Sequence, residues 1–110
     1  MKINIKALSV NKVWCGRRFK TKDYKDYERE AFYLLSDTII ISKGNLELKL
    51  EVGLSSKLAD IDNIAKPFID ILQKKYNFND KRIYKLIMIK KIVKKGEEYI
   101  DFKFKKYCKS

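Results

Sequence analysis

A strict alternation of apolar and charged residues near the middle of the chain constrains its fold more than any other feature. A period of two is typical of a β-strand with one buried face, and here it runs through Leu46, Glu47, Leu48, Lys49, Leu50, Glu51 and Val52. The segment from Ile100 to Lys105 alternates in the same way. The apolar face of such strands has to be covered, so the chain is predicted to place another layer against one side of a sheet.

Two segments have the helical spacing of apolar residues that suits this second layer. The first is predicted to begin at Thr21 or Asp23, which are good N-cap residues, and to end near Leu35. The second is predicted from Asn63 to about Tyr76, and its apolar stripe consists of Ile64, Phe68, Ile69, Leu72 and Tyr76.

Pro67 limits where the second helix begins. Proline lacks an N–H and crowds the carbonyl four residues back, so it fits only in or near the first turn of a helix. We therefore predict that this helix starts at or just after Asp62 and Asn63. The acidic residues beside it are then at its N-terminus.

Further strands are predicted at residues 2–10, 37–41 and 83–93, with turns at 43–45 and 94–97. The resulting order is strand, helix, strands, helix, strand, strand. We expect a single domain spanning residues 1–110, of the α+β class, in which two helices pack on a mixed or antiparallel sheet in two layers.

The net charge restricts the class of partner. The chain has 26 Lys and Arg against 14 Asp and Glu, a net charge of +12, and such an excess favours a polyanion. Nucleic acid is preferred to a membrane, because the basic residues are spread along the chain and no segment approaches the roughly 20 apolar residues of a membrane span. The first six residues alternate like a strand and lack the apolar core of a signal peptide, so we expect a cytoplasmic protein.

Scarce residue types exclude several kinds of catalytic site. The sequence has no histidine, which excludes Ser-His-Asp triads, histidine-based nucleases and ordinary Cys/His zinc sites. Cys15 and Cys108 lie near opposite ends of the chain and form no CxxC pair, so we expect two reduced thiols. Nuclease chemistry in this chain must use carboxylates, Lys, Tyr or metal-bound water.

Acidic residues gather around the start of the second predicted helix. Asp60 and Asp62 are two residues apart, and Asp62, Lys66 and Asp70 follow one another at i, i+4 and i+8, which places them on one stripe of the helix. Asp80 comes from the polar turn after the helix. Helix capping explains part of this pattern, because Asp is favoured at the N-terminus of a helix. Capping needs only one such residue, however, and gives Asp80 no role.

The alternative interpretation of these residues is a metal-dependent catalytic site. Asp60, Asp62 and Asp80 would bind one or two Mg²⁺ ions, which take carboxylate and water oxygens and need no histidine. The metal would activate a water and stabilise the leaving oxygen of a phosphodiester. Lys66 would contact the scissile phosphate and offset its developing charge.

A second acidic pattern competes with the first. Asp37, followed by Glu47-Leu48-Lys49, is similar to the D…E-x-K pattern of another nuclease superfamily. Charged residues at this spacing are also typical of the solvated face of an alternating strand. We favour that structural interpretation of Glu47 and Lys49.

The segment before the first predicted helix is strongly basic and contains Trp14 and Phe19. One interpretation is a solvated loop. The one that we favour is an arm that neutralises DNA phosphates and stacks an aromatic ring on an unpaired base. The predicted nucleic-acid-binding residues are Lys12, Arg17, Arg18, Lys20 and Lys22.

The acidic residues and their spacing resemble the RusA family of Holliday junction resolvases. That family's pattern is D-x-D-N-x-x-K, then an Asp four residues on, then an Asp-Asp pair after the helix. The chief departure is Asn79, which stands where the family usually has the first Asp of the pair. Ser9 and Asn11 are weakly similar to the family's N-terminal P-S-x-N loop, without its prolines. The matching residues are Asp60, Asp62, Asn63, Lys66, Asp70 and Asp80.

The resemblance implies a Mg²⁺-dependent endodeoxyribonuclease of DNA recombination and repair, often encoded by phages or prophages of bacteria. It would work as a homodimer in which each subunit nicks one strand of a four-way junction. Asp60, Asp62 and Asp80 would bind the metal and act in catalysis, with Lys66 assisting. A different function is also open, that of a non-catalytic DNA- or RNA-binding module in which the acidic residues are caps and Asn79 marks a decayed site.

Overall fold

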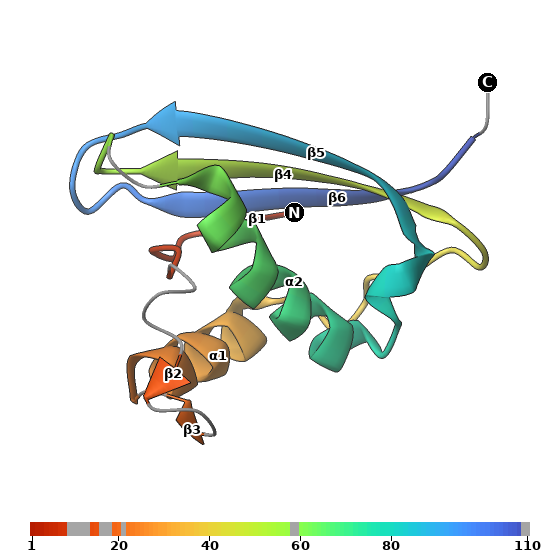
Figure 1. Cartoon of the computed structure of the whole chain (residues 1–110), viewed down its shortest axis with the longest axis horizontal. Coiled ribbons are helices and arrows are strands. Elements are labelled where there is room, and N and C mark those ends of the chain that lie inside the picture. The colour runs from red at the N-terminus through yellow and green to blue at the C-terminus, as the bar shows by residue number, and fades with distance from the viewer. Residues whose placement is uncertain (9–13, 16–18, 21, 58–59, 109–110) are drawn as a thin grey trace.

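The computed structural model describes residues 1–8, 14–15, 19–20, 22–57 and 60–108. It has a four-stranded sheet with both helices on one side (Figure 1), which confirms the two-layer α+β fold. The sheet contains β1 (Lys2–Ile3), β4 (Leu46–Leu54), β5 (Ile83–Ile92) and β6 (Tyr99–Lys106). The helices are α1 (Lys22–Leu34), α2 (Ile61–Tyr76) and the short 3₁₀ turn η2 (Asp80–Arg82), and a separate pair of short strands is formed by β2 (Trp14–Cys15) and β3 (Phe19–Lys20).

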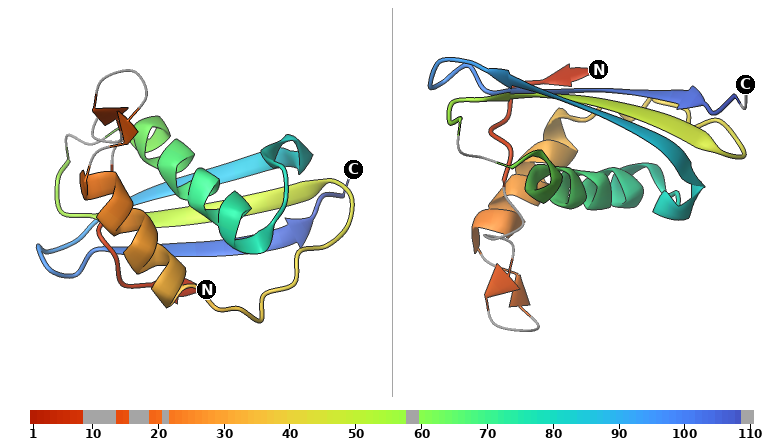
Figure 2. Two further views of the ribbon diagram at one scale, coloured as in Figure 1. Left: turned by 90° about the horizontal axis from the view of Figure 1, so that it is seen from below. Right: turned by 45° about the horizontal axis from the view of Figure 1, so that its top comes forward.

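The sheet is mixed, with the strand order β1-β6-β4-β5. β4 pairs with β5 in parallel and with β6 in antiparallel orientation, and β1 pairs antiparallel with β6. Two parallel neighbours need a crossover connection, and a helix is the usual one. Here α2 and η2 provide it, and α2 crosses the helix side of the sheet (Figure 2, left).

The core lies between the sheet and the two helices. The alternating apolar residues of β4 are buried, as predicted, and point toward the helices. From the other layer, Phe68 of α2 packs edge-to-face on Phe102 of β6, with 5.8 Å between the ring centroids. α1 adds Tyr24, Tyr27 and Ala31, all buried. Each large apolar side chain buried in this way contributes about 1.5–3 kcal/mol to the stability of the fold.

α2 begins at Ile61, earlier than predicted, so Pro67 lies in its second turn. The missing N–H costs the helix one backbone bond, to the carbonyl of residue 63. The proline ring is buried in the core, and this packing offsets part of that loss. The helix ends at Asn77, which adopts the left-handed conformation (φ 52°, ψ 59°) and donates its backbone N–H to the carbonyl of Gln73.

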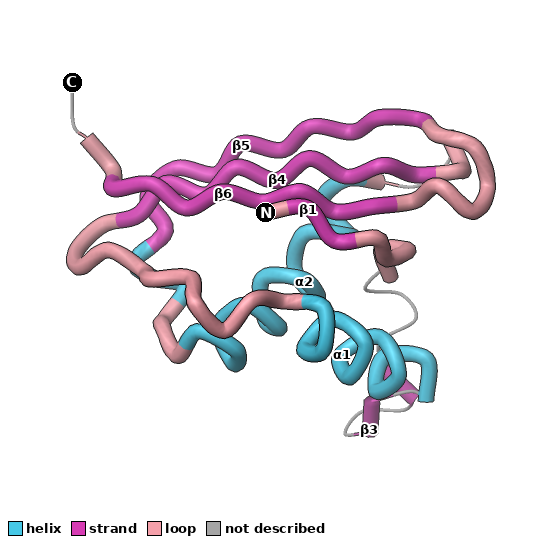
Figure 3. The backbone as a smooth tube through the Cα atoms, turned by 180° about the vertical axis from the view of Figure 1, so that it is seen from behind, coloured by secondary structure: helices cyan, strands magenta, loops and turns pink. Residues whose placement is uncertain are grey.

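Two predicted strands are wrong or shorter than expected. Residues 37–41 form no strand but part of the loop between α1 and β4 (Figure 3). The start of this loop, at Ser36 and Asp37, contacts the end of α2. Tyr76 donates a hydrogen bond to the Ser36 carbonyl at 2.8 Å, and Lys75 pairs with Asp37 at 2.5 Å. The strand predicted at residues 2–10 pairs only at β1, and residues 9–10 lie outside the described part of the chain.

The basic segment before α1 was interpreted as a solvated loop or a DNA-binding arm, and the structure has two short strands within it. Trp14 of β2 is paired with Lys20 of β3, and Cys15 with Phe19. Lys22 is the first residue of α1. Lys12, Arg17 and Arg18 lie outside the described residues.

Candidate functional site

A row of charged residues runs along the outer side of α2 and continues into the turn after it. The Lys66 ammonium donates a hydrogen bond to Asp70 Oδ1 at 2.9 Å and lies 3.6 Å from Asp80 Oδ2. The i, i+4 spacing predicted the first contact, and the second brings in the residue from η2. Two of the predicted site residues, Lys66 and Asp80, therefore meet at one place on the surface together with Asp70, and Lys66 is the cation between two carboxylates.

Gln73, which sequence reasoning missed, holds this arrangement together. Its amide nitrogen donates to Asp70 Oδ1 at 3.2 Å, and its amide oxygen accepts a hydrogen bond from the Asp80 backbone N–H at 2.9 Å. One side chain thus ties the turn after α2 back to the helix. The only signal in the sequence is that Gln73 follows Asp70 by three residues, on the same side of the helix.

The charge on Lys66 is stabilised by its neighbours. The hydrogen bond that Lys66 donates to Asp70 raises the pKa of Lys66, and the charges of Asp70 and Asp80 act in the same direction. Its side chain remains 59% exposed. Lys66 is therefore a protonated, solvent-accessible cation at neutral pH, in a position to meet a phosphate.

The N-terminal end of α2 tests the capping interpretation of the acidic residues. Asp60 occupies the N-cap position, but its side chain makes no capping hydrogen bond. Its carboxylate instead accepts a long hydrogen bond from Asn63 Nδ2, at 3.5 Å. Asp62 Oδ1 accepts a hydrogen bond from the backbone N–H of Asn63 at 3.0 Å. Both carboxylates are exposed. Asp62 satisfies one N–H of the first turn, so capping explains the Asp62 side chain but not that of Asp60.

The chemistry of these donors fits Mg²⁺, which prefers carboxylate and water oxygens. Asp60, Asp62 and Asp80 all supply such oxygens from exposed or half-exposed positions. Within the ranges that the structure describes, no three acidic, His or Cys side chains stand close enough together to hold a metal ion. In the arrangement shown, Asp80 is turned toward Lys66 and Asp70, and Asp60 and Asp62 lie at the start of the helix.

Asn79 has a clear structural role. Its side-chain oxygen accepts a hydrogen bond from the Lys81 backbone N–H at 2.9 Å and caps η2. Asn and Asp cap a helical turn about equally well. The departure from the RusA pattern at this position therefore leaves the turn that carries Asp80 in place.

The structure separates the two parts of the rival D…E-x-K pattern. Asp37 pairs with Lys75 of α2, on the helix side of the sheet. Glu47 alternates with the buried residues of β4 and lies on the opposite side of the sheet, 3.7 Å from Lys85 and 3.9 Å from Lys105. Glu47 and Lys49 thus belong to the charged face of a strand, and Asp37 does not join them.

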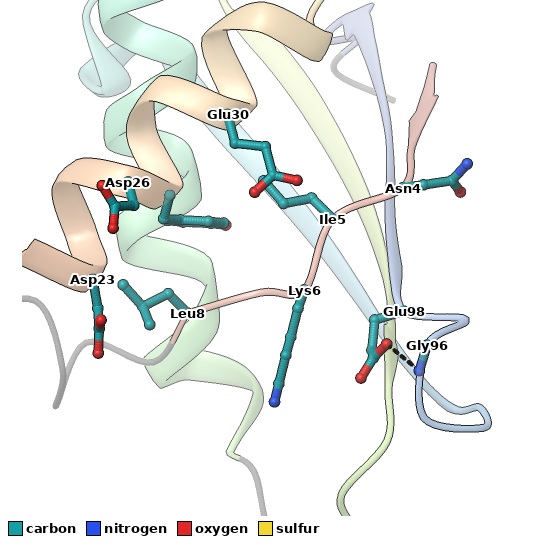
Figure 4. Close-up of a pocket in the computed structure, with 10 residues that line it drawn as sticks. Asn4, Ile5, Lys6, Leu8, Asp23, Asp26, Glu30, Gly96 and Glu98 are labelled. Atoms are coloured by element: carbon teal, nitrogen blue, oxygen red, sulfur yellow. Dashed lines mark hydrogen bonds between the residues drawn. The ribbon is translucent and has the colours of Figure 1, made fainter.

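The molecule also has a hollow of about 390 Å³ between the N-terminal segment, α1 and the turn before β6 (Figure 4). Asp23, Asp26 and Glu30 reach it from one side of α1, and Glu98 reaches it from the turn before β6. The Glu98 backbone N–H and the Ser55 hydroxyl lower the pKa of the Glu98 carboxyl. Because its lining is acidic, the hollow repels phosphate, and it contains none of the predicted site residues.

Comparison with known proteins adds no family to these observations. No protein-family model matches the chain, and a search of curated proteins gives no match. In the described part of the chain, no helix has the length and apolar character to cross a membrane.

Proposed function

We propose that this protein is a Mg²⁺-dependent endodeoxyribonuclease that nicks branched DNA, with the four-way junction as its substrate. The observation that supports this most is the contact of Lys66 with both Asp70 and Asp80. This contact joins Lys66 and Asp70 of α2 to Asp80 of the following turn, and all three residues belong to the RusA-like pattern. The net charge of +12 supports a polyanionic substrate.

The proposed roles follow from the chemistry of each side chain. Asp60, Asp62 and Asp80 would hold Mg²⁺, which when bound supplies the charge that activates water and stabilises the leaving oxygen. Lys66 would bind the scissile phosphate, because it is exposed and stays protonated. Asp70 orients Lys66, and Gln73 fixes the turn that carries Asp80.

The proposal includes a homodimer. A four-way junction has approximate two-fold symmetry, and an isologous dimer presents two equivalent sites to it. Each subunit would cut one strand, and the paired nicks would resolve the junction in the cytoplasm of a bacterium, from a bacterial or phage gene.

The experiment that tests this function is cleavage of a labelled synthetic four-way junction with and without Mg²⁺. Linear duplex of the same sequence is the control substrate. We expect paired, symmetric nicks in the junction alone, and only when Mg²⁺ is present. Equal nicking of the junction and the linear duplex, or nicking that proceeds in EDTA, would contradict the proposal.

Two single variants test the residue assignment. Asp62→Asn should abolish cleavage and leave junction binding intact or tighter, since it removes negative charge near phosphate. Asp26→Asn is the matched control, an equally conservative change at an exposed aspartate of α1, and should cut like the wild type. If Asp62→Asn also cuts like the wild type, the assignment is wrong. If Asp37→Asn or Glu47→Gln abolishes cutting, the rival acidic pattern is the correct one.

A second candidate function is a non-catalytic DNA- or RNA-binding module. The observations that favour it are the uncharged Asn79 in place of an acid and the absence, among the described residues, of three carboxylates grouped for a metal. It predicts tight junction binding with a steep salt dependence and no nicks at any Mg²⁺ concentration. Asn79→Asp then becomes the decisive variant, because it restores the acidic pair; gain of cleavage would identify a decayed nuclease site.

A further inference from the structure

One face of the sheet carries no helix from the described part of the chain. Both helices lie on the same side (Figure 1; Figure 2, right), and the other side carries Glu47, Lys85 and Lys105. We call this side the open face. It lies across the sheet from the helix layer that carries the acidic stripe.

Two acidic residues of the open face, Glu47 and Glu51, are paired with lysines. Glu47 contacts Lys85 and Lys105. Glu51 lies 3.6 Å from Lys91 and accepts a hydrogen bond from the Tyr99 hydroxyl at 2.9 Å. Each of these carboxylates therefore has a lysine close to it, which offsets part of its repulsion of a polyanion.

Two lysines in the middle of the open face lack such partners. Lys49 of β4 and Lys103 of β6 stand directly opposite each other in the antiparallel register. Like charges in this position destabilise a sheet. Among the described residues neither lysine forms a salt bridge, although the charge of Lys49 is one of the causes that lower the pKa of Glu51. The neighbouring Glu51–Asp101 pair has closer cations, Lys91 at Glu51 and the N-terminal ammonium at Asp101. A bound anion between the two lysines would relieve their repulsion.

Two tyrosines stand at one end of the same face. Tyr107 continues the alternation of Lys103 and Lys105, and its ring centroid lies 5.7 Å from that of Tyr84. Tyr84 is 62% exposed. The strand pairing skips it, since Ile83 pairs with Leu46 and Lys85 with Glu47, so Tyr84 and Lys85 both lie opposite Glu47 of the open face. Solvent-exposed aromatic rings beside lysines are what single-stranded nucleic acid needs, because bases stack on the rings and phosphates contact the cations.

We propose that the open face binds single-stranded nucleic acid, with bases stacked on Tyr84 and Tyr107 and phosphates held by Lys49 and Lys103. This goes beyond the proposed nuclease function, because it concerns the opposite side of the sheet and needs no metal. A duplex offers phosphates but no unpaired base to the tyrosines. An anionic membrane matches the charge, but it gives no reason for a tyrosine pair at the end of a row of lysines.

The test is fluorescence anisotropy of an end-labelled single strand of about 20 nucleotides, long enough for the usual site size, in EDTA. We expect the wild type to bind it more tightly than duplex of the same sequence. Tyr84→Ala should weaken binding about tenfold, as loss of one stacked base does, and Tyr84→Phe should retain it. Tyr33→Ala, which removes an 88% exposed tyrosine from α1, should change nothing.

Two lysine variants, one on the open face and one control on α1, complete the test. Lys103→Gln should reduce the slope of log affinity against log salt by about 0.7, the value for one phosphate contact on a single strand. Lys25→Gln removes one exposed lysine from α1 and should leave the slope unchanged.

The proposal is overturned if Tyr84→Ala binds like Tyr33→Ala while its thermal unfolding matches the wild type. It is also overturned if the wild type binds anionic phospholipid vesicles but not the oligonucleotide. Because EDTA prevents metal-dependent cleavage, a failure here is distinct from a failure of the junction-cleavage assay.

Discussion

The Lys66 ammonium lies 3.6 Å from Asp80 Oδ2, so a residue in the second turn of α2 reaches an acid that follows the helix in the sequence. The contact forms because the chain turns back at Asn77 after the helix, and because the Gln73 side chain accepts a hydrogen bond from the Asp80 backbone N–H. The candidate site thus depends on a folded turn as well as on the helical spacing of its residues.

We predict that both acidic neighbours of Lys66 raise its pKa and that Asp70 raises it more than Asp80 does. Asp70→Asn should lower this pKa most, because the Asp70 hydrogen bond is the main cause of its rise, and Asp80→Asn should lower it less. Asp26→Asn on α1 should leave it unchanged. The measurement is an NMR titration of the lysine side chains; equal effects from all three variants would contradict the assigned contacts.

The same shift has a small effect on stability, with a definite sign. The pKa of Lys66 is raised in the folded protein. Its contribution to the free energy of unfolding is therefore fully present below the pKa of the unfolded chain, about 10.4, and is lost as pH rises through the pKa of the folded protein. Because Lys66 is more than half exposed, solvent screens most of this contribution.

Gln73 provides the second prediction. Gln73→Met should cost about 1–2 kcal/mol of stability, because it removes hydrogen bonds to Asp70 and to the Asp80 backbone. It should also reduce any Mg²⁺-dependent nicking, since Asp80 is no longer held at the helix. Urea unfolding and junction cleavage measure the two effects. Unchanged values in both assays would show that the turn is fixed by other contacts.

The elements with strong periodicity were predicted well from the sequence. β4 has the alternation that a half-buried strand requires, and α2 has the apolar stripe of a helix lying on a sheet. The contact of Lys66 with Asp70 follows from spacing alone. Local pattern decides these features, so one sequence was enough.

The features that were missed depend on contacts between distant segments. Residues 37–41 have strand-like composition but are tied to the end of α2 through Asp37 and Ser36. Gln73 has no special composition, and only the turn after α2 gives it a partner in Asp80. The parallel pairing of β4 with β5 likewise depends on the path of the crossover.

The third prediction concerns alkaline pH. Burial, and after it the charge of Glu28, raises the pKa of Tyr24 to about 12. The unfolded chain loses the Tyr24 proton near pH 10, whereas the folded protein keeps it. The contribution of Tyr24 to the free energy of unfolding is therefore fully present below pH 10 and is lost as pH rises toward 12. Thermal unfolding at a series of pH values, with tyrosinate absorbance, follows the loss. Tyr24→Phe should flatten the decline over this interval, and an equally steep decline in that variant would contradict the assignment.

The fourth prediction rests on the close approach of Gly53 and Tyr99. The two residues are paired across β4 and β6, and a Cβ at position 53 would overlap the Tyr99 ring. That ring is held in place by its hydroxyl bond to Glu51 and by Lys2, whose ammonium lies 4.3 Å from the ring centroid. Only glycine leaves room for this arrangement.

Gly53→Ala should therefore destabilise the protein by about 1–3 kcal/mol, the usual cost of overpacking. In a Tyr99→Ala background the obstacle is gone, so the same substitution should cost little, and the double-mutant cycle should show strong coupling. Gly44→Ala is the control: its φ of 85° makes alanine strained, at a cost of about 1 kcal/mol, but the space around it is open, and its effect should be the same with and without Tyr99. Urea unfolding of the variants gives all the values required, and additive effects of Gly53→Ala and Tyr99→Ala would show that the ring does not occupy the space above Gly53.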